Sequence, residues 1–144
     1  MNIAIDFDGT IVEHEYPQIG REIPFAVDTI KMLIRDRHNL ILWSCREGQL
    51  LDDAVEWCRK RGIEFYAINR DYPEESKKGN EHYSRKLKVD MFIDDRNVGG
   101  LPEWGVIYQM IREEKTYEQV MRERLTASDE HHSSHKRKHW WSKR

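Results

Sequence analysis

The sequence has few cysteines and no long apolar segment, and each shortage excludes a class of protein. Two cysteines among 144 residues are too few for a disulfide-built scaffold, so we expect Cys45 and Cys58 to be free thiols, with Cys58 in a helix core. No stretch approaches the roughly 18 apolar residues of a membrane-spanning helix, which argues against a membrane protein. Met1 leads directly into Asn2–Asp6 without the basic start and apolar run of a signal peptide, so we expect a cytoplasmic location.

Charge is distributed unevenly along the chain, although the formal net charge is only −2. Residues 126–144 contain five basic and two acidic residues, a charge of +3, so residues 1–125 carry −5. We therefore expect a mildly acidic domain over 1–125 and a basic, His-rich, flexible tail over 126–144. Such a domain does not bind nucleic acid through bulk charge. Trp140 and Trp141 in the basic tail are compatible with nucleic-acid contact, but a solvated tail is the simpler interpretation.

The spacing of apolar residues predicts strands that alternate with helices. Strands are expected at Asn2–Asp6, Leu40–Trp43, Ile63–Ile68, Val89–Ile93 and within Trp104–Ile111. Helices are expected from Pro24 to Ile34, from Leu50 to Cys58 (with Gly62 as a stop) and from Tyr117 to Leu125. The apolar residues within 9–22 do not recur at a regular interval, so this segment is expected to form a loop or flap. The alternation predicts a doubly wound α/β domain with a mainly parallel, five-stranded sheet between helices.

Polar side chains follow several of the predicted strands. They are Asp6, Asp8, Ser44, Asp94 and Asp95. Ligands of such folds bind at the carboxyl edge of the sheet, where these side chains are expected to meet. Crowded carboxylates repel one another unless a cation lies between them, and oxygen ligands favour Mg²⁺. A phosphate could also bind there if nearby basic residues offset the acids.

The ordered motifs resemble those of the haloacid dehalogenase superfamily of phosphatases and phosphotransferases. The first motif is Asp6-Phe7-Asp8-Gly9-Thr10 after a strand, and the second is Ser44 after the next core strand. A lysine upstream and the pair Asp94-Asp95 after a later strand complete the set in the family's order. The resemblance covers residues 1 to about 125 and implies a Rossmann-like fold.

The resemblance implies an aspartyl-phosphate mechanism. Asp6 would be the nucleophile, and Asp8 would act first as general acid and then as general base. Mg²⁺ would be held by the Asp6 side chain, the Asp8 carbonyl and Asp94, with Asp95 acting through water. Turn or cap acids are the simpler interpretation of each carboxylate taken alone.

The resemblance also implies residues that contact the phosphate. Ser44 would donate to a phosphoryl oxygen, although a helix-capping serine is an alternative. Lys86 would neutralise the nucleophile and the phosphate, and Lys88 is the alternative for this role. The expected substrate-binding residues are Gly9, Thr10, Arg46 and Lys88. For Arg46, an exposed loop arginine is an equally good interpretation.

The chain has no room for the cap domain that this superfamily usually carries. Residues 10–24 can form only a flap, and the segment between Ser44 and Lys86 already contains a helix, a strand and a loop. An open site implies a large substrate or a second subunit that covers it. Tyr16 in the flap could shape specificity, although a surface role is the simpler interpretation for both Tyr16 and His14.

The expected function is therefore Mg²⁺-dependent hydrolysis of a phosphomonoester, with a small or larger phosphorylated molecule as substrate. One alternative is a phosphotransferase, which usually needs a cap to exclude water. A receiver-type phosphoacceptor domain is a second alternative, but the order of the acidic motifs argues against it. A non-catalytic binding domain on the same fold is a third.

Overall fold

The computed structural model describes residues 1–76 and 84–138, with side chains described up to residue 128. The chain divides into two compact units, Met1–Trp104 and Gly105–Arg144, which are described separately below. The sequence had suggested one domain over 1–125. The predicted site residues all belong to the first unit, which contains the sheet.

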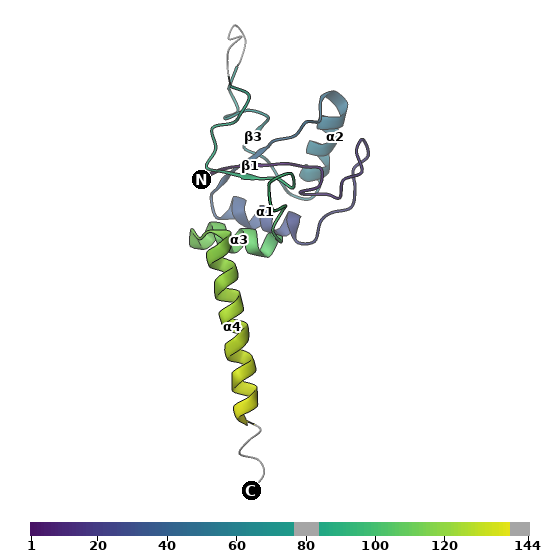
Figure 1. Ribbon diagram of the computed structural model, residues 1–144. Helices are drawn as coiled ribbons and strands as arrows, with labels where there is room; N and C mark the ends of the chain where they lie inside the picture. The colour runs from purple at the N-terminus through teal and green to yellow at the C-terminus, as the bar shows by residue number, and fades with distance from the viewer. Residues whose placement is uncertain (77–83, 139–144) are drawn as a thin grey trace. The chain divides into compact units, whose positions relative to one another are not determined.

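The first unit is built on a parallel sheet of four strands in the order β3-β2-β1-β4 (Figure 1). These strands are β1 (Asn2–Ile5), β2 (Asn39–Leu42), β3 (Ala67–Ile68) and β4 (Met91–Ile93). In the register of the sheet, Ile5 of β1 pairs with Leu42 of β2 on one side and with Ile93 of β4 on the other. Helices α1 (Ala26–Arg35) and α2 (Gly48–Arg59) flank the sheet. The predicted α/β class and parallel sheet are confirmed.

The prediction of a fifth strand within Trp104–Ile111 is wrong. This segment is helix α3 (Trp104–Glu113). Its buried residues Trp104, Ile107 and Ile111 recur at intervals of three and four, which is helical spacing. The third strand is also shorter than predicted, since only Ala67–Ile68 of Ile63–Ile68 pair with β2.

Within the described residues, a non-helical segment packs on one face of the sheet. Ala4, Ile41 and Ala67 share this face and form a buried cluster with Leu87, against which Val89 packs. Leu87 and Val89 belong to the non-helical segment that precedes β4. This arrangement brings the segment that carries both candidate lysines onto the sheet.

The spacing of buried residues explains why α1 and α2 are helices. The buried residues of α1 include Ala26, Ile30 and Leu33, spaced so that one face is apolar. Cys58 is buried in α2 and is a free thiol, as predicted. Gly62 follows that helix with a φ of 79°, a left-handed conformation that suits glycine at a helix end.

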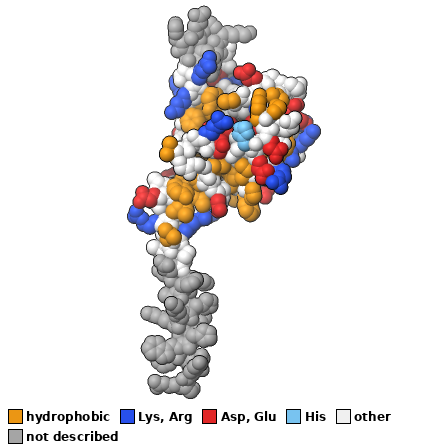
Figure 2. Space-filling model, turned by 45° about the vertical axis from the view of Figure 1, so that its right-hand side comes forward, with side chains coloured by type: hydrophobic (Ala, Val, Ile, Leu, Met, Phe, Trp, Pro, Cys, Tyr) orange, Lys and Arg blue, Asp and Glu red, His pale blue; other side chains and the backbone are white. Residues whose placement is uncertain are grey.

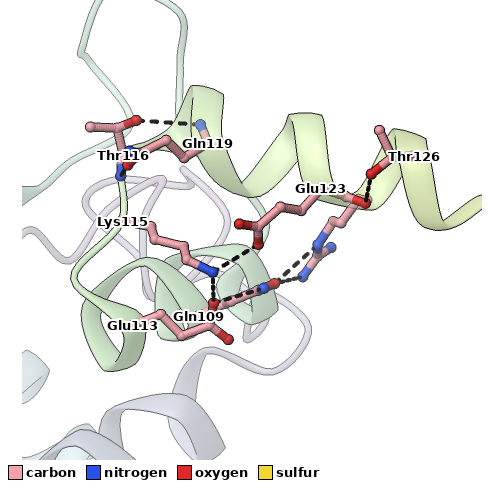
Figure 3. A network of polar contacts seen from close by, with 8 residues as sticks. Gln109, Glu113, Lys115, Thr116, Gln119, Glu123 and Thr126 are labelled. Carbon is pink, nitrogen blue, oxygen red and sulfur yellow. Dashed lines mark hydrogen bonds and ion pairs between the residues drawn. The ribbon is translucent and has the colours of Figure 1, made fainter.

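The second unit contains α4 (Tyr117–Lys138), which begins at a capping box. The backbone N–H of Thr116 donates to Oε1 of Gln119, and the Gln119 N–H donates to the Thr116 hydroxyl (Figure 3). Lys115 Nζ contacts Glu113 at 2.7 Å and Glu123 at 2.9 Å, which links the turn to both helices. The helix continues to Lys138, beyond the expected end near Leu125.

The flexibility predicted for the tail remains a prediction, and Trp140 and Trp141 lie outside the described residues. Within the described ranges, no helix combines the length and apolarity that a membrane span requires. On the face drawn in Figure 2, basic and acidic side chains are interspersed, with apolar side chains between them.

Candidate active site

A pocket of about 400 Å³ lies at the carboxyl edge of the sheet. Its lining comes from the ends of β1, β2 and β4 and from the flap. The lining residues are Asp6, Asp8, His14, Tyr16, Trp43, Ser44, Cys45, Arg46, Asp94 and Arg96. A larger pocket of about 540 Å³ lies beside α2 and β3, but its lining contains none of the predicted site residues. We therefore place the candidate active site in the smaller pocket.

The structure brings together three of the predicted acids. Carboxylate oxygens of Asp6, Asp94 and Asp95 all lie within 4.8 Å of one another. One oxygen of this cluster, Oδ1 of Asp95, is buried without a hydrogen-bond partner. A buried carboxylate oxygen without a partner is costly, and a cation among the three acids would supply one. The donor set and its spacing therefore fit a divalent metal with oxygen ligands.

Crowding of the acids changes the protonation of Asp6. The pKa of Asp6 is raised to about 7, mainly by burial, and the negative charges of Asp94, Asp95 and Asp8 contribute to the same shift. A hydrogen bond from the Phe7 backbone opposes this shift. Asp6 without a cation therefore keeps its proton to a higher pH than an ordinary aspartate does, whereas a nearby cation would favour the carboxylate.

Thr10 connects the first motif to the acidic pair. Its hydroxyl accepts a hydrogen bond from the Asp95 backbone N–H at 3.1 Å, and its carbonyl accepts one from Nε1 of Trp104 at 3.1 Å. Thr10 is fully buried. The structure thus gives Thr10 a role in fixing the position of Asp95, and the expected substrate contact stays a prediction.

Asp8 is paired with Arg46 instead of joining the three clustered acids. Nε and Nη2 of Arg46 each donate to one carboxylate oxygen of Asp8, both at 2.7 Å. This pairing is the main cause that raises the pKa of Arg46. Arg46 was expected as a phosphate contact or an exposed loop residue, but its guanidinium is buried against Asp8.

Ser44 is held by an asparagine that sequence reasoning missed. The Ser44 N–H donates to Oδ1 of Asn69 at 2.8 Å, and Nδ2 of Asn69 donates to the Ser44 carbonyl at 3.0 Å. Asn69 follows β3 with a φ of 54°, a left-handed conformation that asparagine tolerates. The N-cap of α2 is Glu47, so Ser44 does not cap that helix. Ser44 lines the pocket, and its hydroxyl accepts a hydrogen bond from the Arg46 backbone N–H at 3.2 Å.

Neither candidate lysine lines the pocket. Nζ of Lys86 lies 5.6 Å from the ring centroid of Phe92, whose partner in β1 is Ala4. Lys86 is therefore beside β4, the strand that leads to Asp94. Both lysines are exposed, and the Lys88 backbone N–H donates to Asp71. The assignment of the motif lysine to Lys86 stays a prediction.

The flap and the end of β4 supply residues that sequence reasoning treated as ordinary surface or did not consider. His14 and Tyr16 from the flap line the pocket together with Trp43 and Arg96. Nε2 of His14 lies 3.5 Å from Nη2 of Arg96. The sequence signal that could have identified Arg96 is its position directly after the acidic pair at a strand end.

The fold and pocket define an α/β protein with a parallel sheet and an acidic site at its carboxyl edge. A search of solved structures finds similarity to a conserved protein of Bacteroides thetaiotaomicron, with 67% sequence identity and a TM-score of 0.76. The similarity covers 82% of this chain and 94% of the Bacteroides chain, so this chain belongs to the same protein family. No family model and no curated protein matches the chain.

Proposed function

We propose that the protein is a Mg²⁺-dependent phosphomonoester hydrolase that acts through an aspartyl phosphate. The observation that carries the proposal is the cluster of Asp6, Asp94 and Asp95, whose carboxylate oxygens lie within 4.8 Å of one another. Asp6 and Asp94 of this cluster line the pocket. The resemblance of the motifs to the haloacid dehalogenase superfamily supports the same chemistry.

Asp6, Asp94 and Asp95 would hold the metal ion. The buried Oδ1 of Asp95 without a partner supports this set, because a purely structural carboxylate would have a donor at each buried oxygen. When bound, Mg²⁺ would offset the negative charges of the carboxylates and of the phosphoryl oxygens.

Asp6 and Asp8 divide the reaction between them. An Asp6 oxygen attacks phosphorus while the bond from phosphorus to the leaving oxygen breaks, and the leaving oxygen takes a proton from Asp8. Asp8 then accepts a proton from water, whose oxygen attacks phosphorus and releases Asp6 and inorganic phosphate. The Ser44 hydroxyl orients a phosphoryl oxygen, and Lys86 reduces the repulsion between the phosphate and Asp6.

The test is hydrolysis of p-nitrophenyl phosphate by the purified chain. We expect turnover with Mg²⁺, none with EDTA, and a loss of at least about 1000-fold in Asp6→Asn. Asp28→Asn is the matched control, because Asp28 is an exposed acid in the first turn of α1. The control should keep the wild-type rate.

A panel of phosphorylated metabolites extends the same assay. Absence of Mg²⁺-dependent turnover throughout the panel would refute the hydrolase. Acyl phosphate on Asp6 that persists for hours would instead indicate a receiver-type phosphoacceptor. Transfer of phosphate to an added alcohol in preference to water would indicate a phosphotransferase.

A further inference from the structure

Arg46 is a fully buried charged residue in the wall of the candidate active site. It lies between β2 and α2, and only 1% of its side-chain surface is exposed. Its two hydrogen bonds to Asp8 have the bidentate geometry that arginine forms with carboxylates. Burial of such a pair carries a desolvation cost, so the remaining donors of the guanidinium also need partners.

The flap (residues 9–22) provides those partners. Nη1 of Arg46 donates to the Pro17 carbonyl at 3.0 Å, and Nη2 donates to the Gln18 carbonyl at 2.8 Å. The guanidinium carbon also lies 5.2 Å from the ring centroid of Phe7 and 5.3 Å from that of Tyr16. One side chain therefore holds both Asp8 and the tip of the flap.

The base of the flap is fixed independently of Arg46. The Glu13 N–H donates to the Arg21 carbonyl at 2.7 Å, and an antiparallel bridge joins Val12 to Glu22. The side chains of Glu13 and Arg21 also form an ion pair at 3.1 Å. Loss of Arg46 should therefore release the tip of the flap without unfolding its base.

We propose that Arg46 is a positioning residue that fixes the orientation of Asp8 and the closed position of the flap together. This inference rests on the proposed function, in which Asp8 transfers a proton to the leaving group. A carboxylate has about four acceptor sites, so the two bonds to Arg46 leave sites at which Asp8 can carry the proton that it transfers. The Asp8 side chain is 12% exposed, and Asp8 lines the pocket.

The same connection sets the width of the pocket. His14 and Tyr16 of the flap line it opposite the strand ends. Since the flap tip and Asp8 share one guanidinium, a leaving group that fits beneath the flap meets Asp8 in a fixed geometry. Misplacement of a reacting group by about 1 Å can reduce a rate by about 100-fold, so we expect Arg46 to act on kcat more than on KM.

The first experiment compares Arg46→Met and Arg46→Lys with wild type in p-nitrophenyl phosphate hydrolysis. Lysine keeps the charge but lacks the planar guanidinium with its several N–H donors, so it cannot hold Asp8 and both flap carbonyls. We expect kcat to fall about 100-fold in Arg46→Met and at least about tenfold in Arg46→Lys, with KM within about threefold. Arg59→Met is the matched control, because Arg59 forms an exposed bidentate pair with Glu56.

The second experiment adds free guanidinium to Arg46→Ala at concentrations that do not unfold the protein. We expect saturable recovery of kcat with guanidinium and no recovery with urea, which has a similar shape but no charge. Arg59→Met should not respond to either compound. Equal recovery with urea would refute a role for the charge of the guanidinium group.

A third measurement does not depend on catalysis. Loss of the bonds from Arg46 to the Pro17 and Gln18 carbonyls should free the flap tip, so cleavage after Glu15 by a glutamate-specific protease should become at least about tenfold faster in both Arg46→Met and Arg46→Lys, and should not change in Arg59→Met. Wild-type protein without turnover would refute the hydrolase, while an unchanged cleavage rate would refute the positioning role whether or not the hydrolase is active. An active wild type with unchanged kcat in both Arg46 variants would also refute it.

Discussion

Gly9 and Asp95 are packed so closely that a Cβ atom at residue 9 would overlap Oδ2 of Asp95. Gly9 also has a φ of 85°, which side-chain-bearing residues rarely adopt. We expect Gly9→Ala to lower the free energy of unfolding by about 1–2 kcal/mol through backbone strain and by about 1–3 kcal/mol through the overlap. Urea unfolding measures this loss, and a Mg²⁺ titration should show weaker binding.

The variant Gly48→Ala distinguishes the effect of backbone strain from that of steric overlap. Gly48 has a φ of 53°, but no atom lies within 4 Å of the position of its Cβ. We expect this variant to lose only the strain energy and to bind Mg²⁺ as wild type does. Equal losses in the two glycine variants would contradict the proposed contact with Asp95.

The raised pKa of Asp6 predicts a pH dependence of stability in the metal-free protein. The carboxyl has a pKa of about 7 when folded, against an ordinary value of 3.8. Between these values the folded state holds a proton that the unfolded state has lost, so stability falls as pH rises from about 4 to about 7. Asn cannot ionise, so we expect metal-free Asp6→Asn to be more stable than wild type at pH 8 and similar to it near pH 4.

Thermal unfolding in EDTA at several pH values tests this prediction. Addition of Mg²⁺ at pH 8 should stabilise wild type and leave Asp6→Asn nearly unchanged, because the variant lacks one carboxylate ligand. A stability difference between the two proteins that is independent of pH would show that Asp6 titrates normally.

Removal of Asp94 should weaken metal binding. We expect Asp94→Asn to raise the Kd for Mg²⁺ by at least about tenfold, since a proposed ligand becomes neutral. Asp90→Asn is a matched control, because Asp90 precedes the same strand, β4, at its opposite end, where it accepts a hydrogen bond from the Asn2 N–H. Calorimetric titration with Mg²⁺ measures both, and a similar Kd for the two variants would place the metal elsewhere.

The two candidate lysines can be distinguished by rate. We expect Lys86→Met to lower kcat by at least about 100-fold, because in the proposed function Lys86 offsets the charges of Asp6 and the phosphate. Lys88→Met should stay within about threefold of wild type, since its described contact is through the backbone. A larger loss in Lys88→Met than in Lys86→Met would reverse the assignment.

The capping box of α4 predicts a local loss of stability. Thr116→Ala removes one half of the box, and we expect about 1 kcal/mol less protection of the amides of residues 117–121. Thr126→Ala is the control, because the Thr126 hydroxyl only donates to a carbonyl of its own helix, that of Glu123 (Figure 3). Hydrogen exchange measures both, and equal effects would exclude a capping role.

Much of the fold could be predicted because the spacing of apolar residues within a short segment indicates its type of element. The apolar stripe Ala26, Ile30, Leu33 and the run Leu40–Leu42 each indicate one type of element. The positions of Asp6 and Asp94 could also be predicted, because the ends of adjacent parallel strands lie at one edge. In contrast, the apolar residues of Trp104–Ile111 fit the spacing of either a strand or a helix, and the segment is a helix.

The role of Arg46 could not be predicted, because it depends on contacts between distant parts of the sequence. Its partners Asp8 and Pro17 are 38 and 29 residues away. Burial of arginine requires several acceptors to meet at one point, and no local pattern encodes this. The contact between Asn69 and Ser44 has the same origin, since two separate loops supply the partners.

The way the flap is attached has a practical consequence for altering substrate range. Arg46 binds the flap tip through the backbone carbonyls of Pro17 and Gln18, so the Gln18 side chain is not needed for that attachment. Gly20 cannot change, because a Cβ there would overlap the Glu13 carbonyl. A variant library should therefore randomise positions 14, 16 and 18 and keep Gly20 fixed. Such a library changes the chemistry presented by the flap while preserving its path.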